Sequence, residues 1–167
     1  MNAALAIPVG VVVERRKAAS PWVDFTWRPV EVLAGEPVAE PWTVLSQDND
    51  VTSFYAGSTS IELYRTETAN YRDNLFADSR LWVVLRPTAA EPPYQLVRVT
   101  ADPAEGEAFT EAGNDLVDTV PMPAAIRQMV EAFVAEHHVE RDFVKRKRNR
   151  ADPEALARRP GGREDDE

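Results

Sequence analysis

The sequence contains no cysteine, only two histidines and only seven glycines among its 167 residues. The absence of cysteine excludes disulfides, thiolate nucleophiles, iron–sulfur ligation and cysteine-based zinc sites, and it fits a reducing cytosol. The few glycines form neither a Walker loop nor a Gly-x-Gly-x-x-Gly pattern, so the common phosphate-binding loops are missing as well. We therefore expect the protein to hold no cofactor and no metal.

The two histidines, His137 and His138, are adjacent in the sequence. On a helix their side chains point about 100° apart, so they do not chelate one metal as an i, i+4 pair would. We interpret His137 as a partly buried histidine near a helix C-terminus, where the helix dipole favours the charged form. A metal-binding or acid–base role is the alternative. The sequence has no Gly-x-Ser-x-Gly motif, and no pair of carboxylates stands out as catalytic.

Long hydrophobic runs are also missing. The longest run, residues 3–13, is about half as long as the roughly 20 residues that a membrane-spanning helix needs, and it contains Pro8 and Gly10. Only Met1 and Asn2 precede this run, so the basic start of a secretory signal is absent. We expect a cytoplasmic protein without membrane insertion.

The net charge of −9 is unevenly distributed along the chain. Residues 141–167 carry nine Lys or Arg and seven Asp or Glu, whereas residues 1–140 carry ten and twenty-one. An acidic body repels phosphate backbones and membrane surfaces, which argues against nucleic-acid binding. We expect one α+β domain over residues 1–140 and a flexible tail, first basic and then acidic, over residues 141–167.

Short β-branched and aromatic segments fill the first two thirds of the chain. They predict strands over residues 7–16, 22–33, 42–45, 51–55, 58–66, 81–85, 94–100 and 116–120. The segments 51–55 and 58–66 are expected to form a hairpin that turns near Gly57. Pro29, within the segment 22–33, requires a sheet edge or a bulge. Residues 68–79 are ambiguous: their polar character suggests a loop, with a helical turn as the alternative.

Two helical patterns follow. Asp102 and Pro103 predict the start of a short helix that ends at Gly113. An apolar stripe at helical spacing predicts a longer helix over residues 123–138. The expected fold is an α+β domain. It has a twisted antiparallel sheet or partial barrel, two C-terminal helices and a flexible basic tail.

The stretch PWVDFTWRPV, residues 21–30, is rich in aromatic side chains. In a strand, one of its faces carries Phe25 and Trp27, which we interpret as core. The opposite face carries Trp22, Asp24 and Arg28. These three residues are either a surface charge pair beside an aromatic residue or a patch that binds a partner, because an aromatic beside an arginine is typical of an interface anchor.

A second candidate binding segment lies in the tail. Phe143 is off the apolar stripe of the preceding helix, and the cationic run Lys145, Arg146, Lys147 and Arg148 follows it. An aromatic anchor with guanidinium groups suits an acidic groove on a partner protein. The alternatives are a solvated helix end, phosphate contacts with a nucleic acid, and pairing with the acidic body of the chain.

Four segments together resemble one bacterial family. They are GVVVERRKAASPWVDFTWRPVEVL, LWVVLRP, VPMP and FVAEHHVERDFVKRKRNR, and the resemblance spans residues 7–150. The family is the uncharacterised one catalogued as domain of unknown function 3305. Its members tend to be encoded beside genes for molybdenum-dependent formate dehydrogenases. The resemblance therefore implies a non-enzymatic accessory or small-subunit role in such a system, exerted by contact with formate dehydrogenase subunits or co-encoded accessory proteins.

The resemblance also implies an alternative. Some relatives carry the label of a molybdopterin-guanine dinucleotide biosynthesis protein, so the chain would mature or handle the molybdopterin cofactor. The sequence argues against this label, because residues 14–20 after the first strand contain no glycine-rich phosphate loop. A pocket in which arginine side chains surround a phosphate-sized space would favour the alternative; the arginines concerned are Arg15, Arg16, Arg28 and Arg86.

Overall fold

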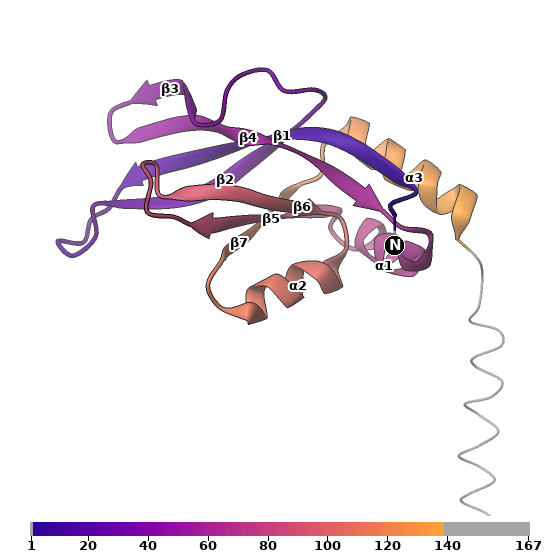
Figure 1. Ribbon diagram of the computed structural model, residues 1–167. Coiled ribbons are helices and arrows are strands. Elements are labelled where there is room, and N and C mark those ends of the chain that lie inside the picture. Colours follow the sequence, from indigo (N-terminus) through magenta and orange to yellow (C-terminus); the bar gives the residue numbers. More distant parts are fainter. Residues whose placement is uncertain (1, 139–167) are drawn as a thin grey trace, which may run out of the picture. The chain divides into compact units, whose positions relative to one another are not determined.

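The computed structural model describes residues 2–138. Two antiparallel sheets and three α-helices make up this part of the chain (Figure 1). The four-stranded sheet has the order β2-β1-β4-β3, from β1 (Leu5–Lys17), β2 (Phe25–Ala34), β3 (Thr43–Asp48) and β4 (Val51–Leu63). The three-stranded sheet has the order β6-β5-β7, from β5 (Arg80–Pro87), β6 (Tyr94–Thr100) and β7 (Leu116–Pro121). The helices are α1 (Thr68–Phe76), preceded by a 3₁₀ turn (Arg65–Glu67), α2 (Pro103–Ala112) and α3 (Ala124–His137).

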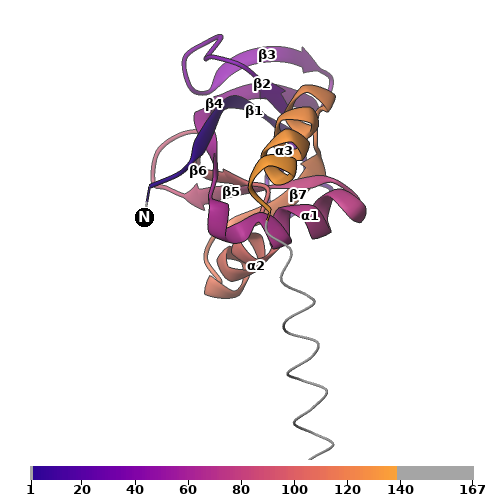
Figure 2. The same cartoon turned by 90° about the vertical axis from the view of Figure 1, so that its right-hand side faces the viewer.

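The two sheets pack face to face around the core (Figure 2). Strand β6 lies beside β4 and β7 lies beside β2, but the strands of the two sheets do not join into one hydrogen-bonded barrel within the described residues. The inward faces show the period of two expected of strands. The residues of β1 and β5 in the main core cluster that have no exposed surface are Val9, Val11, Val13, Leu81, Val83 and Leu85, and Val84 between the last two on β5 is also fully buried. The predicted antiparallel sheet with a partial barrel shape is confirmed.

Both predicted helices are confirmed. The Asp102 carboxylate accepts a hydrogen bond of 2.9 Å from the N–H of Ala104 at the start of α2, and Gly113 ends the helix with a φ of 99°. Helix α3 packs against α1 and closes one part of the core through its buried apolar stripe: Ile126, Val130 and Phe133. The third helix, α1, replaces the loop that the polar composition of residues 68–79 suggested.

The predicted hairpin near Gly57 is wrong. Strand β4 runs without interruption through Gly57, whose φ is 146°. Its pairing with β1 shifts register at this point, since Val11 lies opposite Gly57 and Val12 opposite Tyr55. The glycine therefore serves a β-bulge and not a turn. Pro29 also lies at a register shift, on the edge strand β2 of its sheet, as predicted.

Asn74 connects α1 to one end of the smaller sheet, where β5 begins and β6 ends. Its side chain is buried, and Nδ2 donates to the carbonyl oxygens of Arg80 at 2.8 Å and Ala101 at 3.0 Å. Its Oδ1 accepts a hydrogen bond of 3.0 Å from the N–H of Arg80. The amide thus satisfies three backbone groups at the junction of α1 with β5 and β6, which explains why a polar segment folds as a helix here.

Candidate interaction surface

Five aromatic residues gather where β2 and β4 meet the turn between β5 and β6. We call the set Phe25, Trp27, Trp42, Phe54 and Tyr94 the aromatic platform. Trp27 is its centre, because its ring lies 5.8 Å from Phe54, 5.8 Å from Tyr94 and 6.1 Å from Trp42 between ring centres. Phe54 is buried, Trp27 and Trp42 are partly buried, and Phe25 is 37% exposed. The platform is therefore a continuation of the core that reaches the surface.

Arg15 lies over the platform. Its guanidinium carbon is 4.3 Å from the ring centre of Phe25, 5.4 Å from that of Phe54 and 5.8 Å from that of Trp27. These are cation–π distances. The side chain also donates from Nη2 to Thr52 Oγ1 at 3.3 Å. A charged group is thus held against apolar rings by its own fold.

Exposed apolar side chains border the platform. We call Trp22, Val23 and Val44 the apolar rim; they are 89%, 49% and 53% exposed. Val44 lies opposite Phe54 in the β3–β4 ladder, so the two side chains share a face of the sheet. The connection from β1 to β2 and the connection from β3 to β4 lie at the same end of the sheet (Figure 1), where the N–H of Lys17 donates to the carbonyl of Asp50.

The predicted grouping of Trp22, Asp24 and Arg28 on one strand face is wrong. Strand β2 begins at Phe25, so Trp22 and Asp24 precede it and strand alternation does not govern them. Arg28 does lie on β2, but it is directly opposite Glu14, whose Oε1 is 3.9 Å from its Nε. Trp22 and Asp24 are exposed, as expected of contact residues. The interpretation of Phe25 as a core residue is wrong, because its side chain is 37% exposed at the start of β2.

The tail residues lie outside the described part of the chain. This applies to Phe143, Lys145, Arg146, Lys147 and Arg148, which stay a prediction.

The sequence suggested Arg15 only as one of four arginines that would surround a phosphate. A signal for its true position was present, because the alternation of Val11 and Val13 places Arg15 on the inward face of β1.

The four arginines named for a phosphate pocket already have partners within the protein. Arg16 and Arg28 lie 3.1 Å and 3.9 Å from Glu14 Oε1, and Arg15 is stacked on aromatic rings. Arg86 makes two hydrogen bonds to the carboxylate of Asp115, at 2.9 Å and 2.8 Å. These hydrogen bonds lower the pKa of Asp115. The guanidinium groups therefore do not converge on one phosphate-sized space.

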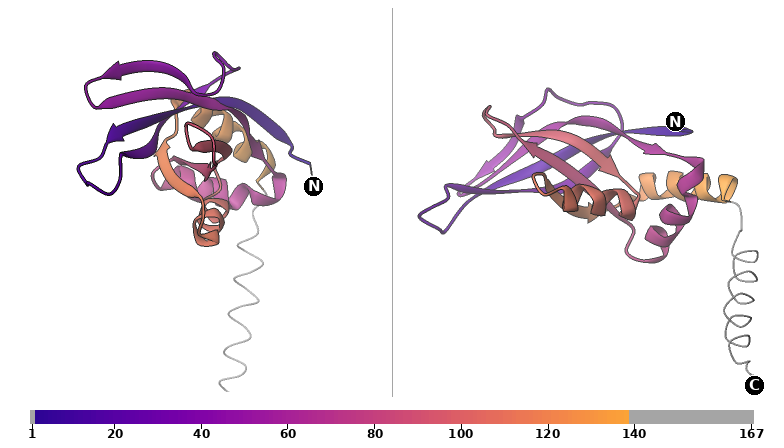
Figure 3. Two further views of the ribbon diagram at one scale, coloured as in Figure 1. Left: turned by 60° about the vertical axis from the view of Figure 1, so that its left-hand side comes forward. Right: turned by 60° about the horizontal axis from the view of Figure 1, so that its bottom comes forward.

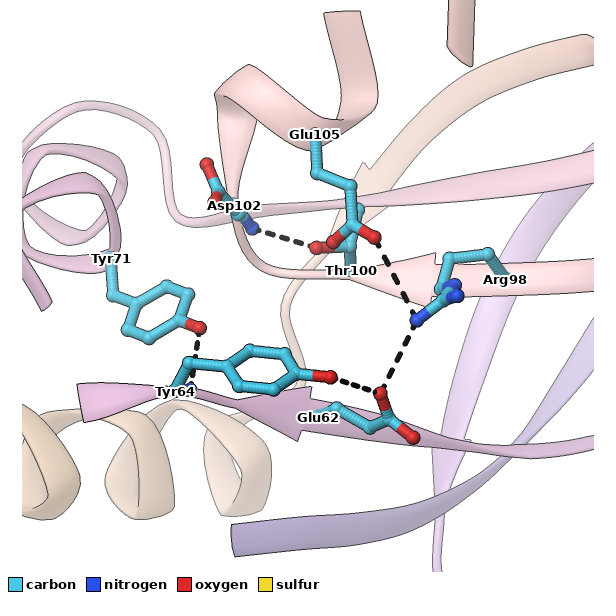
Figure 4. Close-up of polar contacts among 7 residues, drawn as sticks. All are labelled: Glu62, Tyr64, Tyr71, Arg98, Thr100, Asp102 and Glu105. Carbon is cyan, nitrogen blue, oxygen red and sulfur yellow. Dashed lines mark hydrogen bonds and ion pairs between the residues drawn. The ribbon is translucent and has the colours of Figure 1, made fainter. Parts of the chain in front are cut away.

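A second polar cluster joins β4, β6 and α2 (Figure 4). Arg98 on β6 lies between two carboxylates, with Nη1 at 3.4 Å from Glu62 Oε1 and 3.7 Å from Glu105 Oε2. The hydroxyl of Tyr64 donates to the same Glu62 oxygen at 2.6 Å, and this hydrogen bond raises the pKa of Tyr64. Because β4 and β6 share no ladder, this cluster links the two sheets where backbone pairing does not.

Neither tyrosine of this region is activated for chemistry. The hydroxyl of Tyr71 accepts a hydrogen bond of 2.9 Å from the N–H of Tyr64, and burial raises the pKa of Tyr71 to about 12. A raised pKa keeps the phenol neutral, whereas a nucleophile or general base needs a lowered one. Across residues 2–138, no group of three or more histidine, aspartate and glutamate side chains is placed to hold a metal.

His137 takes the position expected of a structural histidine. Its ring lies 4.5 Å from that of Phe133 between ring centres, and its side chain is 19% exposed at the end of α3. No helix within residues 2–138 has the length and apolar character needed to cross a membrane.

The fold is α+β, and the candidate site is a surface formed by the aromatic platform, Arg15 and the apolar rim. The chain belongs to the family described as "Protein of unknown function (DUF3305)", which matches residues 8–147. This confirms the resemblance found in the sequence. No curated protein matches the chain, and no solved structure matches it.

Proposed function

We propose that the protein is a non-enzymatic interaction protein that binds a protein partner through the aromatic platform and the apolar rim. The observation that carries the proposal is the exposure of Trp22, which is 89% exposed beside Val23 and Phe25. Exposing large apolar side chains together is unfavourable in water, and tryptophan and arginine dominate the energetic centres of protein interfaces. Trp22 provides an exposed tryptophan, and Arg15, which lies over Phe25 three residues further along the chain, provides the arginine.

The proposed partner belongs to a molybdenum-dependent formate dehydrogenase system in the cytosol. The support is the gene neighbourhood that family membership implies, and the family itself is matched over residues 8–147. In this proposal the chain acts as an accessory protein or small subunit of the dehydrogenase. The alternative, maturation or handling of the molybdopterin cofactor, has less support because Arg16, Arg28 and Arg86 are paired with carboxylates.

A second contact with the partner is proposed from the sequence alone. Phe143 followed by Lys145, Arg146, Lys147 and Arg148 combines an aromatic anchor with cations that pair with carboxylates. Asp24 and Arg28 are placed in the same proposal as contacts at the margin of the apolar rim. Charged residues at an interface margin affect the association rate and its salt dependence more than the affinity.

Affinity purification from the native host with mass spectrometry tests the proposal. Four forms of the protein are compared: the full chain, a form that stops after Glu140, the double variant Trp22→Ser/Val23→Ser, and the control Phe76→Ser. Phe76 is 76% exposed on α1, so it matches Trp22 in exposure but lies outside the rim. We expect the full chain and the control to retrieve formate dehydrogenase subunits, and the rim variant to lose them.

The form that stops after Glu140 reports on the tail alone. Loss of the partner from this form supports the tail contact, and full retention removes it from the proposal. Equal retrieval by the rim variant and the full chain contradicts the role of the rim. A bound pterin or nucleotide without any protein partner contradicts the interaction proposal and favours cofactor handling.

A further inference from the structure

Arg15 carries a charge that no carboxylate neutralises within the described residues. Its contacts there are the hydroxyl of Thr52 and the rings of Phe25, Phe54 and Trp27. Arg86 and Arg98 each lie within 4 Å of at least one carboxylate, whereas Arg80 donates to Thr119 and Arg72 lies over the ring of Phe76. The chain is acidic overall, with 28 Asp and Glu against 19 Lys and Arg. Arg15 is distinguished from these other arginines by its contact with three aromatic rings at once, and this contact is the feature that needs an explanation.

The surroundings of Arg15 fix its orientation. Rings contact the guanidinium plane, and Thr52 accepts from only one of its nitrogens. A guanidinium has five N–H donors, so most of them stay available to a partner. Because the side chain is already ordered, binding costs little additional side-chain entropy. The apolar rings also lower the local polarity, which strengthens a charge-assisted hydrogen bond.

We propose that Arg15 binds a carboxylate of the partner protein, and that an apolar side chain next to this carboxylate packs on Trp22 and Phe25. The inference rests on the proposed function and specifies the chemistry of its partner: a surface segment with Asp or Glu beside a large apolar residue. A planar carboxylate matches the guanidinium fork in a bidentate arrangement. A phosphate is disfavoured, because the neighbouring cations Arg16 and Arg28 pair with Glu14 and the chain has a net charge of −9.

A peptide pair tests this inference by nuclear magnetic resonance on the ¹⁵N-labelled full chain. One peptide is acetyl-Ser-Leu-Phe-Glu-Leu-Ser-amide, and the other replaces its glutamate with glutamine, which keeps the shape and removes the charge. We expect the glutamate peptide to shift the Arg15 side-chain N–H signal and the indole N–H signals of Trp22 and Trp27. The glutamine peptide should bind about fivefold more weakly, as expected for the loss of a charge-assisted hydrogen bond.

Two variants serve as controls. Arg15→Gln should remove the difference between the peptides, and its amide spectrum reports whether the domain still folds. Arg127→Gln, which removes an exposed pair with Glu131 on α3, should preserve the difference. The quantity to compare is the loss of peptide affinity that Arg15→Gln causes. If this loss is the same for the glutamate peptide and for the glutamine peptide, the inference is wrong.

The outcomes also separate the inference from the proposed function. Equal binding of the two peptides at the indole signals overturns carboxylate recognition and leaves the platform as a protein-binding surface. Shifts at Arg86 or Arg98 in place of Arg15 likewise overturn the inference. If neither peptide moves the indole signals of Trp22 and Trp27, the platform does not bind apolar segments, and the proposed function fails together with the inference.

Discussion

The guanidinium carbon of Arg15 lies 4.3 Å from the ring centre of Phe25, although the two residues are not opposite each other in the β1–β2 ladder. Arg15 is opposite Trp27, and Phe25 is opposite Lys17. The arginine therefore reaches diagonally across the strands and lies against three platform rings at once. As a result, the surface combines a fixed charge with aromatic area, and charge on such a surface contributes specificity as well as affinity.

The exposure of Trp22 predicts that this residue contributes to binding and not to folding. Trp22→Ala should change the free energy of unfolding by less than about 0.5 kcal/mol, as exposed substitutions usually do. Trp27→Ala should cost about 2–3 kcal/mol, because Trp27 contacts three other rings of the platform. Urea unfolding of the two variants measures this contrast. A comparable cost for both variants would contradict the assignment of Trp22 to the rim.

The hydrogen bonds of Asn74 predict a strong effect of a nearly isosteric change. Asn74→Asp replaces the donor that faces the carbonyl oxygens of Arg80 and Ala101 with a carboxylate oxygen. We expect destabilisation by about 2–4 kcal/mol near neutral pH, since buried groups lose their partners and like charges approach. The exposed Asn114→Asp provides the matched control, with an effect near zero. Thermal unfolding distinguishes them, and equal midpoints would argue against the connecting role of Asn74.

Gly106 in α2 lies so close to β5 that replacing it with alanine, a better helix former, should lower the stability of the protein. A Cβ atom added at Gly106 would lie 2.3 Å from the indole ring of Trp82, which is closer than side-chain atoms approach. Gly106→Ala should therefore destabilise the protein, although alanine gains about 1 kcal/mol in helix propensity. The helical control Ala108→Gly, at an exposed position of α2, should lose about that amount. A stabilised Gly106→Ala variant would contradict the close contact of α2 with β5.

The pKa of Tyr71, raised by burial to about 12 from 10.0, predicts an alkaline loss of stability. The neutral phenol is favoured in the folded state, so its contribution is complete below pH 10 and is lost as the pH rises from 10 towards 12. Tyr71→Phe should remove this slope. Near neutral pH it should cost about 1–2 kcal/mol, because the N–H of Tyr64 loses its acceptor.

Urea unfolding at several alkaline pH values measures the slope, and tyrosinate absorbance reports the ionisation itself. An unchanged slope in Tyr71→Phe would mean that another group causes the alkaline transition.

The sequence predicted the elements whose signals are local. Strand β6 is rich in aromatic and β-branched residues, α2 has Asp102 before it and Gly113 after it, and α3 has an apolar stripe at helical spacing. The two failures depend on distant contacts. Gly57 is equally compatible with a turn and with a bulge, and only the pairing of β4 with β1 decides between them. Helix α1 is polar, and the hydrogen bonds of Asn74 to other elements stabilise it.

The candidate surface was predicted only in part, because some of its features follow from local sequence and others from contacts between distant segments. The exposure of Trp22 follows from its neighbourhood in the sequence, whereas the strand boundary at Phe25 does not. The face on which Arg15 lies follows from strand alternation. Its contact with Phe54 does not, because that contact depends on the pairing of β1 with β4, two strands far apart in the sequence that lie side by side in the fold (Figure 3).

Photo-crosslinking from single positions tests the central claim most directly. The photoreactive residue p-benzoylphenylalanine is placed at Trp22 in one version of the protein and at Phe76 in another, and both are irradiated in cells of the native host. The two positions are 89% and 76% exposed, so general collisions affect them similarly. The account predicts one discrete protein adduct from position 22 and none from position 76. No adduct from position 22, or the same adducts from both positions, would contradict it.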